Sequence, residues 1–120
     1  MLKRFCTAKV SGAVVTEAAL HYEGSLGLDA AILQAAGIRP YEMALVANMA
    51  NGNRFETYLI PKPAGSGAVC LYGGAARLGK PGDELIIMVS GWLDPAEAVL
   101  FEGPRVIRLL PGNRLPAGTR

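Results

Sequence analysis

The chain has 120 residues and a formal net charge of +2; 51% of its residues are hydrophobic and 18% are charged. This apolar content excludes a disordered chain. The length fits a single domain, residues 1–120, with one modest core and little room for a large cofactor pocket. Fifteen glycines and eight prolines favour strands joined by tight turns over a helical bundle. We therefore expect a mainly β fold with short helices, either a small barrel or an open sandwich.

The positive charge is concentrated at the C-terminal end. Residues 1–104 contain eight basic and ten acidic residues, whereas Arg105, Arg108, Arg114 and Arg120 have no acidic residue after them. Four spaced arginines are too sparse for a nucleic-acid surface, so we expect no nucleic-acid partner. No apolar run approaches a membrane span or a signal peptide, which predicts a cytoplasmic protein. Cys6 and Cys70 lack metal-ligand spacing, and no metal site is expected.

The first half of the chain is expected to begin with strands at residues 2–10 and 13–16. A polar stretch, residues 20–25, follows them. Asp29 is a good N-cap and Gly37 a good C-terminal stop for a short helix at residues 30–36. Strands are then expected at 43–48 and 54–60, because Asn51-Gly52 between them is a strong hairpin signal.

The second half is expected to contain a strand at 68–72 and a small-residue turn at 73–76. The nearly all-apolar segment 85–90 predicts a strand that is buried on both faces. One helical turn at 95–99 and a last strand at 106–110 complete the prediction. Residues 111–120, rich in proline, glycine and arginine, are expected to form a mobile tail.

Gly24-Ser25 is the first candidate for chemistry. A serine hydroxyl directly after glycine can attack the preceding carbonyl, because glycine allows a strained backbone and a close approach. The acyl group then moves from nitrogen to oxygen, and elimination cuts the chain and leaves a dehydroalanine, which hydrolyses to an N-terminal pyruvoyl group. An ordinary turn is the alternative reading of this dipeptide.

Three further groups could bind or react with a small acid. Arg54 could hold a carboxylate through paired N–H donors, Thr57 offers a hydroxyl, and Tyr58 could donate a proton; taken alone, an exposed hairpin strand is the favoured reading of this segment. The small residues of Gly73-Gly74-Ala75-Ala76 would let a ligand approach backbone N–H groups, or would allow a strand to pack closely against a helix. Lys9 could face a ligand carboxylate, although such a lysine is more often a solvated edge residue.

Taken together, the chain resembles the pyruvoyl-dependent aspartate 1-decarboxylase family over nearly its whole length. The residues that carry this resemblance are Lys9, Leu20-His21-Tyr22-Glu23-Gly24-Ser25, Asn51-Gly52, Arg54-Phe55, Thr57-Tyr58, Gly73, Ala75, Ala76, Gly82-Asp83, residues 94–98 and Phe101-Glu102-Gly103. The resemblance implies a double-psi β-barrel. It also implies self-cleavage between Gly24 and Ser25 into a β chain, residues 1–24, and an α chain, residues 25–120.

The implied activity is decarboxylation of L-aspartate to β-alanine and CO₂ for pantothenate biosynthesis, through a Schiff base to a pyruvoyl group derived from Ser25. The resemblance also implies a homotetramer with active sites between subunits. It gives Thr57 a role in cleavage and substrate contact, and makes Tyr58 the proton donor. By the same resemblance, the backbone of Gly73, Gly74 and Ala75 contacts the substrate, and Lys9 and Arg54 bind its carboxylates.

Two positions depart from the family pattern, which has asparagine at the position of Tyr72 and often histidine at that of Ser11. These departures leave open a self-processing decarboxylase of another small amino acid. A non-enzymatic small-barrel binding module is a third reading, and the need for a maturation helper protein stays open.

A geometric conflict also arises, because Arg54 and Tyr58 share one face of a regular strand while Thr57 lies on the other. A bulge or a subunit interface would resolve it, and the interface is favoured.

Overall fold

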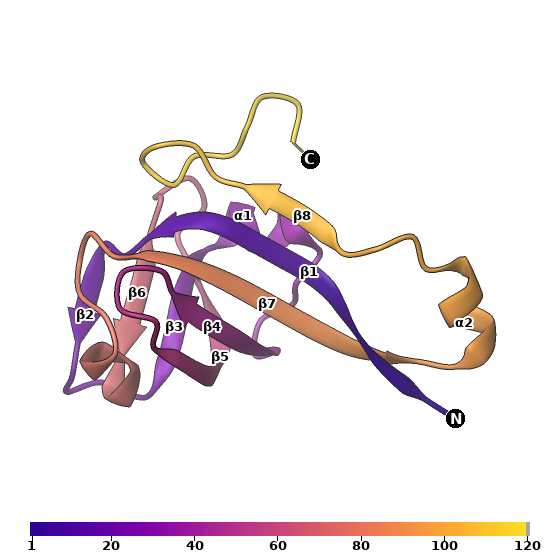
Figure 1. Cartoon of the computed structure of the whole chain (residues 1–120). Coiled ribbons are helices and arrows are strands. Elements are labelled where there is room, and N and C mark those ends of the chain that lie inside the picture. The colour runs from indigo at the N-terminus through magenta and orange to yellow at the C-terminus, as the bar shows by residue number, and fades with distance from the viewer. Residues whose placement is uncertain (120) are drawn as a thin grey trace.

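The computed structural model describes residues 1–119, and the fold is mainly β with short helices, as predicted (Figure 1). Its elements are β1 Lys3–Val14, β2 Glu17–Ala19, β3 Ser25–Asp29, α1 Ala30–Ala36, β4 Met43–Asn48, β5 Arg54–Lys62, β6 Val69–Tyr72, the 3₁₀ helix η1 Gly73–Arg77, β7 Glu84–Leu93, α2 Pro95–Leu100 and β8 Arg105–Arg108. No helix of residues 1–119 is long and apolar enough to cross a membrane.

The strands form a single mixed sheet that bends back on itself. Its strand order is β2-β6-β3-β5-β4-β7-β1-β8. The chain links the two sides of this order directly, because β1, the second-last strand, continues through Val15 and Thr16 into β2, the first strand. The Val15 N–H bonds to the carbonyl of Asp83, and the Thr16 N–H bonds to the carbonyl of Val69. This wrapping is compatible with a double-psi β-barrel and differs from two stacked sheets.

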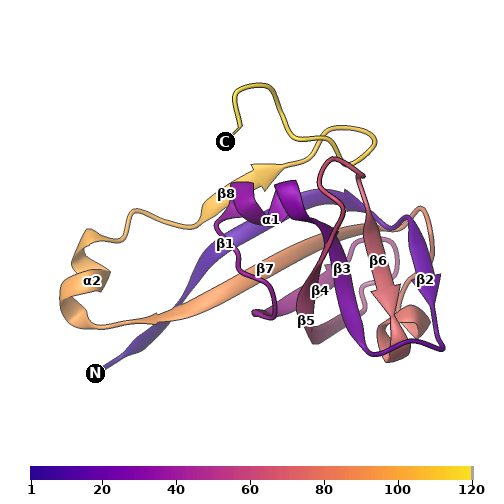
Figure 2. The same ribbon diagram turned by 180° about the vertical axis from the view of Figure 1, so that it is seen from behind.

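β1 is one long strand where the sequence predicted two. It pairs antiparallel with β7 along its length, with an irregularity in register between Val10 and Ala13. Gly12 lies there at φ +75°, and a Cβ at this position would come within 3.0 Å of the Leu109 carbonyl oxygen. The glycine therefore bends the strand without ending it, as in a β-bulge. In Figures 1 and 2, β1 and β7 extend together beyond the rest of the sheet towards the N-terminus and α2.

The prediction that residues 85–90 are buried on both faces is wrong. Leu85, Ile87 and Val89 are buried, but Ile86 and Met88 are partly exposed and Ser90 is exposed. This alternation is the pattern of a strand with one face on the core. On this outer face, Met88 and Trp92 line a groove described below.

The sequence also failed to predict β2 and β3. β3 begins at Ser25, within the stretch expected to be polar, and all five of its residues are buried. It lies between β5, to which it is parallel, and β6, to which it is antiparallel. Two neighbours of this kind supply the hydrogen bonds for a strand whose own sequence, Ser-Leu-Gly-Leu-Asp, gives only a weak strand signal.

Helix α1 confirms the local prediction in full. The Asp29 side chain accepts a hydrogen bond from the Ala31 N–H at 2.8 Å, and Gly37 ends the helix at φ 71°. The same carboxylate accepts from the backbone N–H groups of Gly65 and Gly67. Ile32 and Leu33 belong to the core, which is one cluster of side chains from α1 and the inner faces of the strands.

The first part of the C-terminal tail packs against the barrel. Asn113 is buried, and its side chain bonds to both backbone groups of Val14 and to the Gly67 carbonyl. Mobility of residues 111–119 stays a prediction, and Arg120 lies outside the described residues.

Candidate active site

Ser25 begins β3, a strand whose residues are all buried, and lies directly after an exposed, irregular segment. Its exposed fraction is 1%. The hydroxyl donates a hydrogen bond to the Glu23 carbonyl oxygen at 3.3 Å. Residues 20–24 are exposed and belong to no strand. The Gly24–Ser25 bond therefore joins a loosely held segment to a rigid one.

Gly73 packs directly against the backbone that precedes Ser25. It has φ +65°, and a Cβ at this position would lie 2.7 Å from the Gly24 Cα and 2.9 Å from the Tyr22 carbonyl oxygen. Both the left-handed backbone and the contact require glycine here. The structure thus brings the predicted small-residue segment to the predicted cleavage bond. Gly74 is exposed, and Ala75 is buried.

Tyr72 is the cross-strand neighbour of Ser25, since the two residues pair in register between β3 and β6. It is 3% exposed, and its hydroxyl donates to the Glu17 carboxylate at 3.3 Å. The Lys62 ammonium lies 5.2 Å from the ring centre. Burial raises the pKa of Tyr72, so its phenol stays protonated, and side-chain hydrogen bonding with Tyr72 raises the pKa of Lys62, which stays a cation.

A pocket of about 330 Å³ opens beside Ser25. It is lined by Tyr22, Glu23, Ser25, Tyr41, Tyr58, Ile60 and Pro61. The rings of Tyr41 and Tyr58 are 6.1 Å apart, and Tyr41 has the unusual backbone angle φ 73°. With Tyr72, which stacks on Tyr22, all four tyrosines of the chain gather around this site.

Thr57 does not line this pocket. β5 keeps a regular register with β4 and with β3, so no bulge turns Thr57 towards Tyr58. Thr57 pairs with the buried Ala44 on the face that looks towards the core. A bulge in β5 therefore does not explain how Thr57 and Tyr58 could serve the same site.

Lys9 and Arg54 also lie apart from the Ser25 pocket. Arg54 is at the opposite end of β5 from the residues that pair with β3. Lys9 is on β1, where it pairs with Met88; Met88 pairs with Leu45, which in turn pairs with Glu56. This row places Lys9 on the outer face of the sheet, three strands away from β5. One chain therefore does not assemble the full predicted set of site residues.

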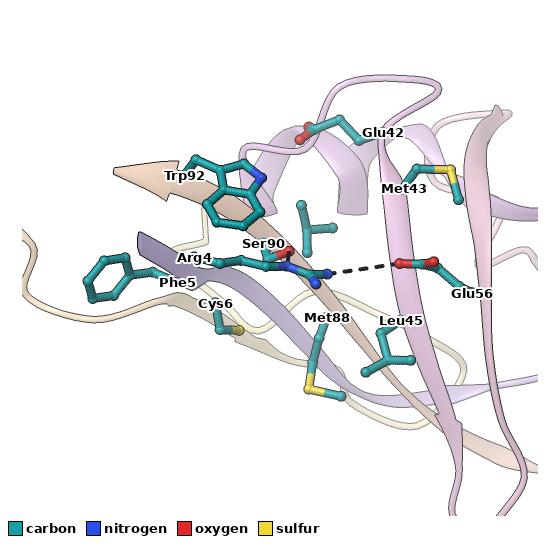
Figure 3. A pocket seen from close by; sticks show the side chains of 11 residues that line it. Arg4, Phe5, Cys6, Glu42, Met43, Leu45, Glu56, Met88, Ser90 and Trp92 are labelled. Atoms are coloured by element: carbon teal, nitrogen blue, oxygen red, sulfur yellow. Dashed lines mark hydrogen bonds and ion pairs between the residues drawn. The ribbon is translucent and has the colours of Figure 1, made fainter. Parts of the chain in front are cut away.

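A groove of about 600 Å³ crosses this outer face (Figure 3). Arg4 lies in it, donating to the Ser90 hydroxyl at 2.7 Å and pairing with Glu56 at 3.9 Å. The remaining lining includes the apolar side chains of Met43, Leu45, Met88 and Trp92. Trp92 is 62% exposed. The groove thus combines a charged pair with an apolar surface next to the row that contains Lys9.

Sequence reasoning named Tyr58 and Tyr72 but missed the rest of the aromatic and charged surroundings of Ser25. Tyr22 was noted only as part of a motif, and neither Tyr41 nor Lys62 was singled out. Their grouping depends on strand register between distant segments, and no local spacing signals it. Among residues 1–119, no three His, Cys, Asp or Glu side chains gather to hold a metal ion.

Comparison with known proteins gives a consistent result. A family model described as aspartate decarboxylase matches residues 1–115. A protein of Leptospira biflexa named aspartate 1-decarboxylase is 46% identical over 95% of this chain and 97% of its own. Proteins of the same name from Methylibium petroleiphilum and Syntrophobacter fumaroxidans are 50% and 47% identical, over 90% and 97% of this chain and 89% and 92% of their own.

Proposed function

The chain belongs to the aspartate decarboxylase family, and we propose that it cuts itself between Gly24 and Ser25 and then converts L-aspartate to β-alanine and CO₂ for pantothenate biosynthesis. The observation that carries this proposal is the packing of Gly73 against Gly24, beside a buried Ser25 hydroxyl. An ordinary turn would not need a glycine in the left-handed region pressed onto its backbone.

The self-cleavage needs no oxidant or reductant, because every bond that breaks is matched by one that forms within the chain or with water. The Ser25 hydroxyl oxygen attacks the Gly24 carbonyl carbon, the carbon–nitrogen bond breaks, and the proton passes to the Ser25 nitrogen, which leaves an ester. Removal of the Ser25 Cα proton then expels the Gly24 carboxylate. The resulting dehydroalanine tautomerises to an imine, and one water molecule releases ammonia and leaves a pyruvoyl group on residue 25.

The residues around Ser25 fit this group, because the pocket beside it is small and its neighbour Tyr58 has a phenol that can supply a proton. A pyruvoyl group supplies a ketone that binds the substrate amine and accepts electrons as CO₂ departs. Tyr58 would hold the proton that replaces the lost carboxylate. Thr57 would assist cleavage and contact substrate from the other face of β5, and the backbone of Gly73, Gly74 and Ala75 would hold the substrate.

Lys9 and Arg54 would bind the two substrate carboxylates as residues of a neighbouring subunit. Within one chain neither lines the Ser25 pocket, and both lie on strands of the outer face that carries the groove. A second copy docked on this face would bring them to the pocket. We therefore propose a homotetramer with active sites between subunits, in which symmetry gives every copy the same contacts.

Intact-mass measurement of purified protein tests the proposal most directly. We expect two species, residues 1–24 and residues 25–120 with an N-terminal pyruvoyl group, and β-alanine formation from aspartate. Ser25→Ala is the matched control and should remain one chain without activity. A wild-type chain that stays whole after prolonged incubation, alone and with lysate of the source cell as a supply of helper protein, would contradict the proposal.

Tyr72 favours a second candidate, which is decarboxylation of another small amino acid. It is the cross-strand neighbour of Ser25, at a position where the family pattern has the smaller asparagine. A panel of amino acids, tested for CO₂ release by the cleaved protein, separates the two candidates. The first predicts the highest kcat/KM with aspartate, and the second predicts it with a different amino acid.

A further inference from the structure

We infer that Tyr22 and Tyr72 form an aromatic stack that positions the Gly24–Ser25 bond for cleavage. The inference rests on the self-cleavage proposed above and assigns a role in it to two residues outside the reacting bond. Tyr22 and Tyr72 would be positioning residues, since neither supplies an atom to the reaction.

The first step of the argument concerns the segment that carries the bond. Residues 20–24 are exposed and have no strand partner. Cleavage requires the Ser25 oxygen to face the Gly24 carbonyl carbon, and a displacement of about 1 Å from a reactive geometry can slow a reaction about 100-fold. Some contact must therefore hold this segment.

The second step identifies that contact. The Tyr22 ring lies on the Tyr72 ring with centroids 4.3 Å apart and an interplanar angle of 33°. Because Tyr22 is 57% exposed, few other contacts hold its side chain, and the contact with the Tyr72 ring is a main one. Aromatic pairs at this distance are stabilising beyond their buried area.

The third step is that Tyr72 is itself rigidly held. Its hydroxyl bonds to Glu17, and the Lys62 ammonium lies over its ring. A Cβ on Gly27 would lie 3.1 Å from the Tyr72 ring and 3.0 Å from the Lys62 stem. The absence of a side chain at Gly27 thus provides the space in which ring and lysine meet. Tyr72 serves as a fixed support, and Tyr22 rests on it.

The fourth step links the stack to the bond. Gly73, directly after Tyr72, contacts both the Tyr22 carbonyl oxygen and the Gly24 backbone. Residues 72 and 73 therefore hold both ends of the stretch from Tyr22 to Gly24, one through a ring and the other through the backbone. Removing either ring should free one end of this stretch.

The experiment follows cleavage of the full chain from the moment of synthesis, by pulse–chase labelling in a cell-free system. Tyr22→Leu and Tyr72→Leu should each slow cleavage about tenfold or more, while Tyr22→Phe and Tyr72→Phe, which keep the rings, should stay within about threefold of wild type. The double leucine variant should cleave about as slowly as the slower single variant, because both changes break the same stack. Leu20→Ala, in the same segment, is the matched control.

Thermal unfolding of the same variants in a Ser25→Ala background separates positioning from general stability. Tyr22→Leu should leave the midpoint nearly unchanged, because its ring is on the surface, and yet slow cleavage. If Tyr72→Leu does not fold, Tyr22→Leu and its phenylalanine counterpart decide the question. Leucine variants that cleave within about twofold of a cleaving wild type would overturn the inference alone. A wild type that never cleaves would overturn the proposed function and this inference together.

Discussion

Gly73 is the residue at which the site should tolerate the least change. Alanine at this position would place a methyl group within 2.7 Å of the Gly24 backbone and would strain a positive φ. We expect Gly73→Ala to slow self-cleavage about tenfold or more, because the scissile bond must move away. Time-resolved intact-mass measurement gives the rate.

Gly74→Ala is the matched control for this prediction. A Cβ on Gly74 meets no atom within 4 Å, so cleavage should proceed at the wild-type rate. Equal slowing by the two substitutions would mean that the first two positions of helix η1 are equally sensitive to a side chain, and it would contradict a specific role for the contact of Gly73 with Gly24.

Tyr58 is expected to act after cleavage and not during it. Tyr58→Phe keeps the ring against Tyr41 but removes the phenol proton. We expect complete cleavage and a fall in kcat of about 100-fold or more, since general acids contribute on this scale. The assay is β-alanine formation by protein whose cleavage has been verified by mass. If Tyr58→Phe keeps the wild-type kcat, another group donates the proton.

At this scale the sequence predicted part of the candidate site and little of its surroundings. Ser25, Gly24, Gly73 and Tyr58 each belong to a short motif whose chemistry can be read locally, and the structure brings them together. The support for them could not be read in this way. Tyr72 reaches Ser25 through strand pairing across 47 positions of sequence. The separation of Lys9 and Arg54 from the Ser25 pocket depends on the order of the strands in the sheet, which no local motif gives.

Among the elements, the C-terminal tail contributes through one side chain. Asn113 exchanges hydrogen bonds with both backbone groups of Val14 and also donates to the Gly67 carbonyl. Asn113→Ala leaves partly buried backbone groups of Val14 and Gly67 without these partners, which should lower the free energy of unfolding by about 1–3 kcal/mol. Urea unfolding in the Ser25→Ala background measures it. Arg114→Ala, at an exposed neighbour, should have a much smaller effect.

The turn before β7 should make stability sensitive to acid. Hydrogen bonds from the Asn48 amide and the Lys80 N–H lower the pKa of Asp83 below its ordinary value of 3.8. Folding therefore favours the charged form, whose contribution is present above the unfolded-state pKa and disappears as the pH falls through the lower folded-state pKa.

Comparison with Asp83→Asn tests this expectation. The variant keeps the shape of the side chain and loses the charge. Its deficit in unfolding free energy should be largest at neutral pH and shrink as the pH is lowered from 5 towards and below the folded-state pKa. A deficit that is independent of pH over this range would show that the charge is not the source of the stabilisation.

Elements with strong local signals were predicted, and those that depend on neighbours were not. α1 has its own cap and stop residues, and the Asn51-Gly52 turn sets the hairpin of β4 and β5. β3 has only five residues, and its strand state comes from β5 and β6 on either side. The apolar run of β7 predicted burial on both faces because a sequence does not distinguish a second core from an exposed apolar groove.

For the whole molecule, the groove on the outer face is expected to mediate assembly. Leu45 lies in the row that links Lys9 to Glu56, and it lines the groove. Leu45→Glu would bury an unpaired carboxylate in a contact between subunits. We expect the native mass, measured by sedimentation, to fall from that of a tetramer, with aspartate turnover falling about tenfold or more.

Met49→Glu is the control, since Met49 is also exposed but does not line the groove. It should keep the wild-type mass and activity. A Leu45→Glu variant that remains a tetramer would exclude this groove as the contact that completes the site.

The path of β1 into β2 has a consequence for a chain that has been cut. The fragment of residues 1–24 contains both strands, and these pair with β7 and β8 at one end of the strand order and with β6 at the other. The small fragment is thus held at both sides of the sheet, and it cannot leave without breaking the pairing of β1 with β7 and β8 and of β2 with β6. Cleavage would then leave the native state intact but turn its refolding from a unimolecular reaction into a bimolecular one. A protein that matures in this way folds as one chain, and after cleavage its stability is kinetic, because it depends on a slow rate of unfolding.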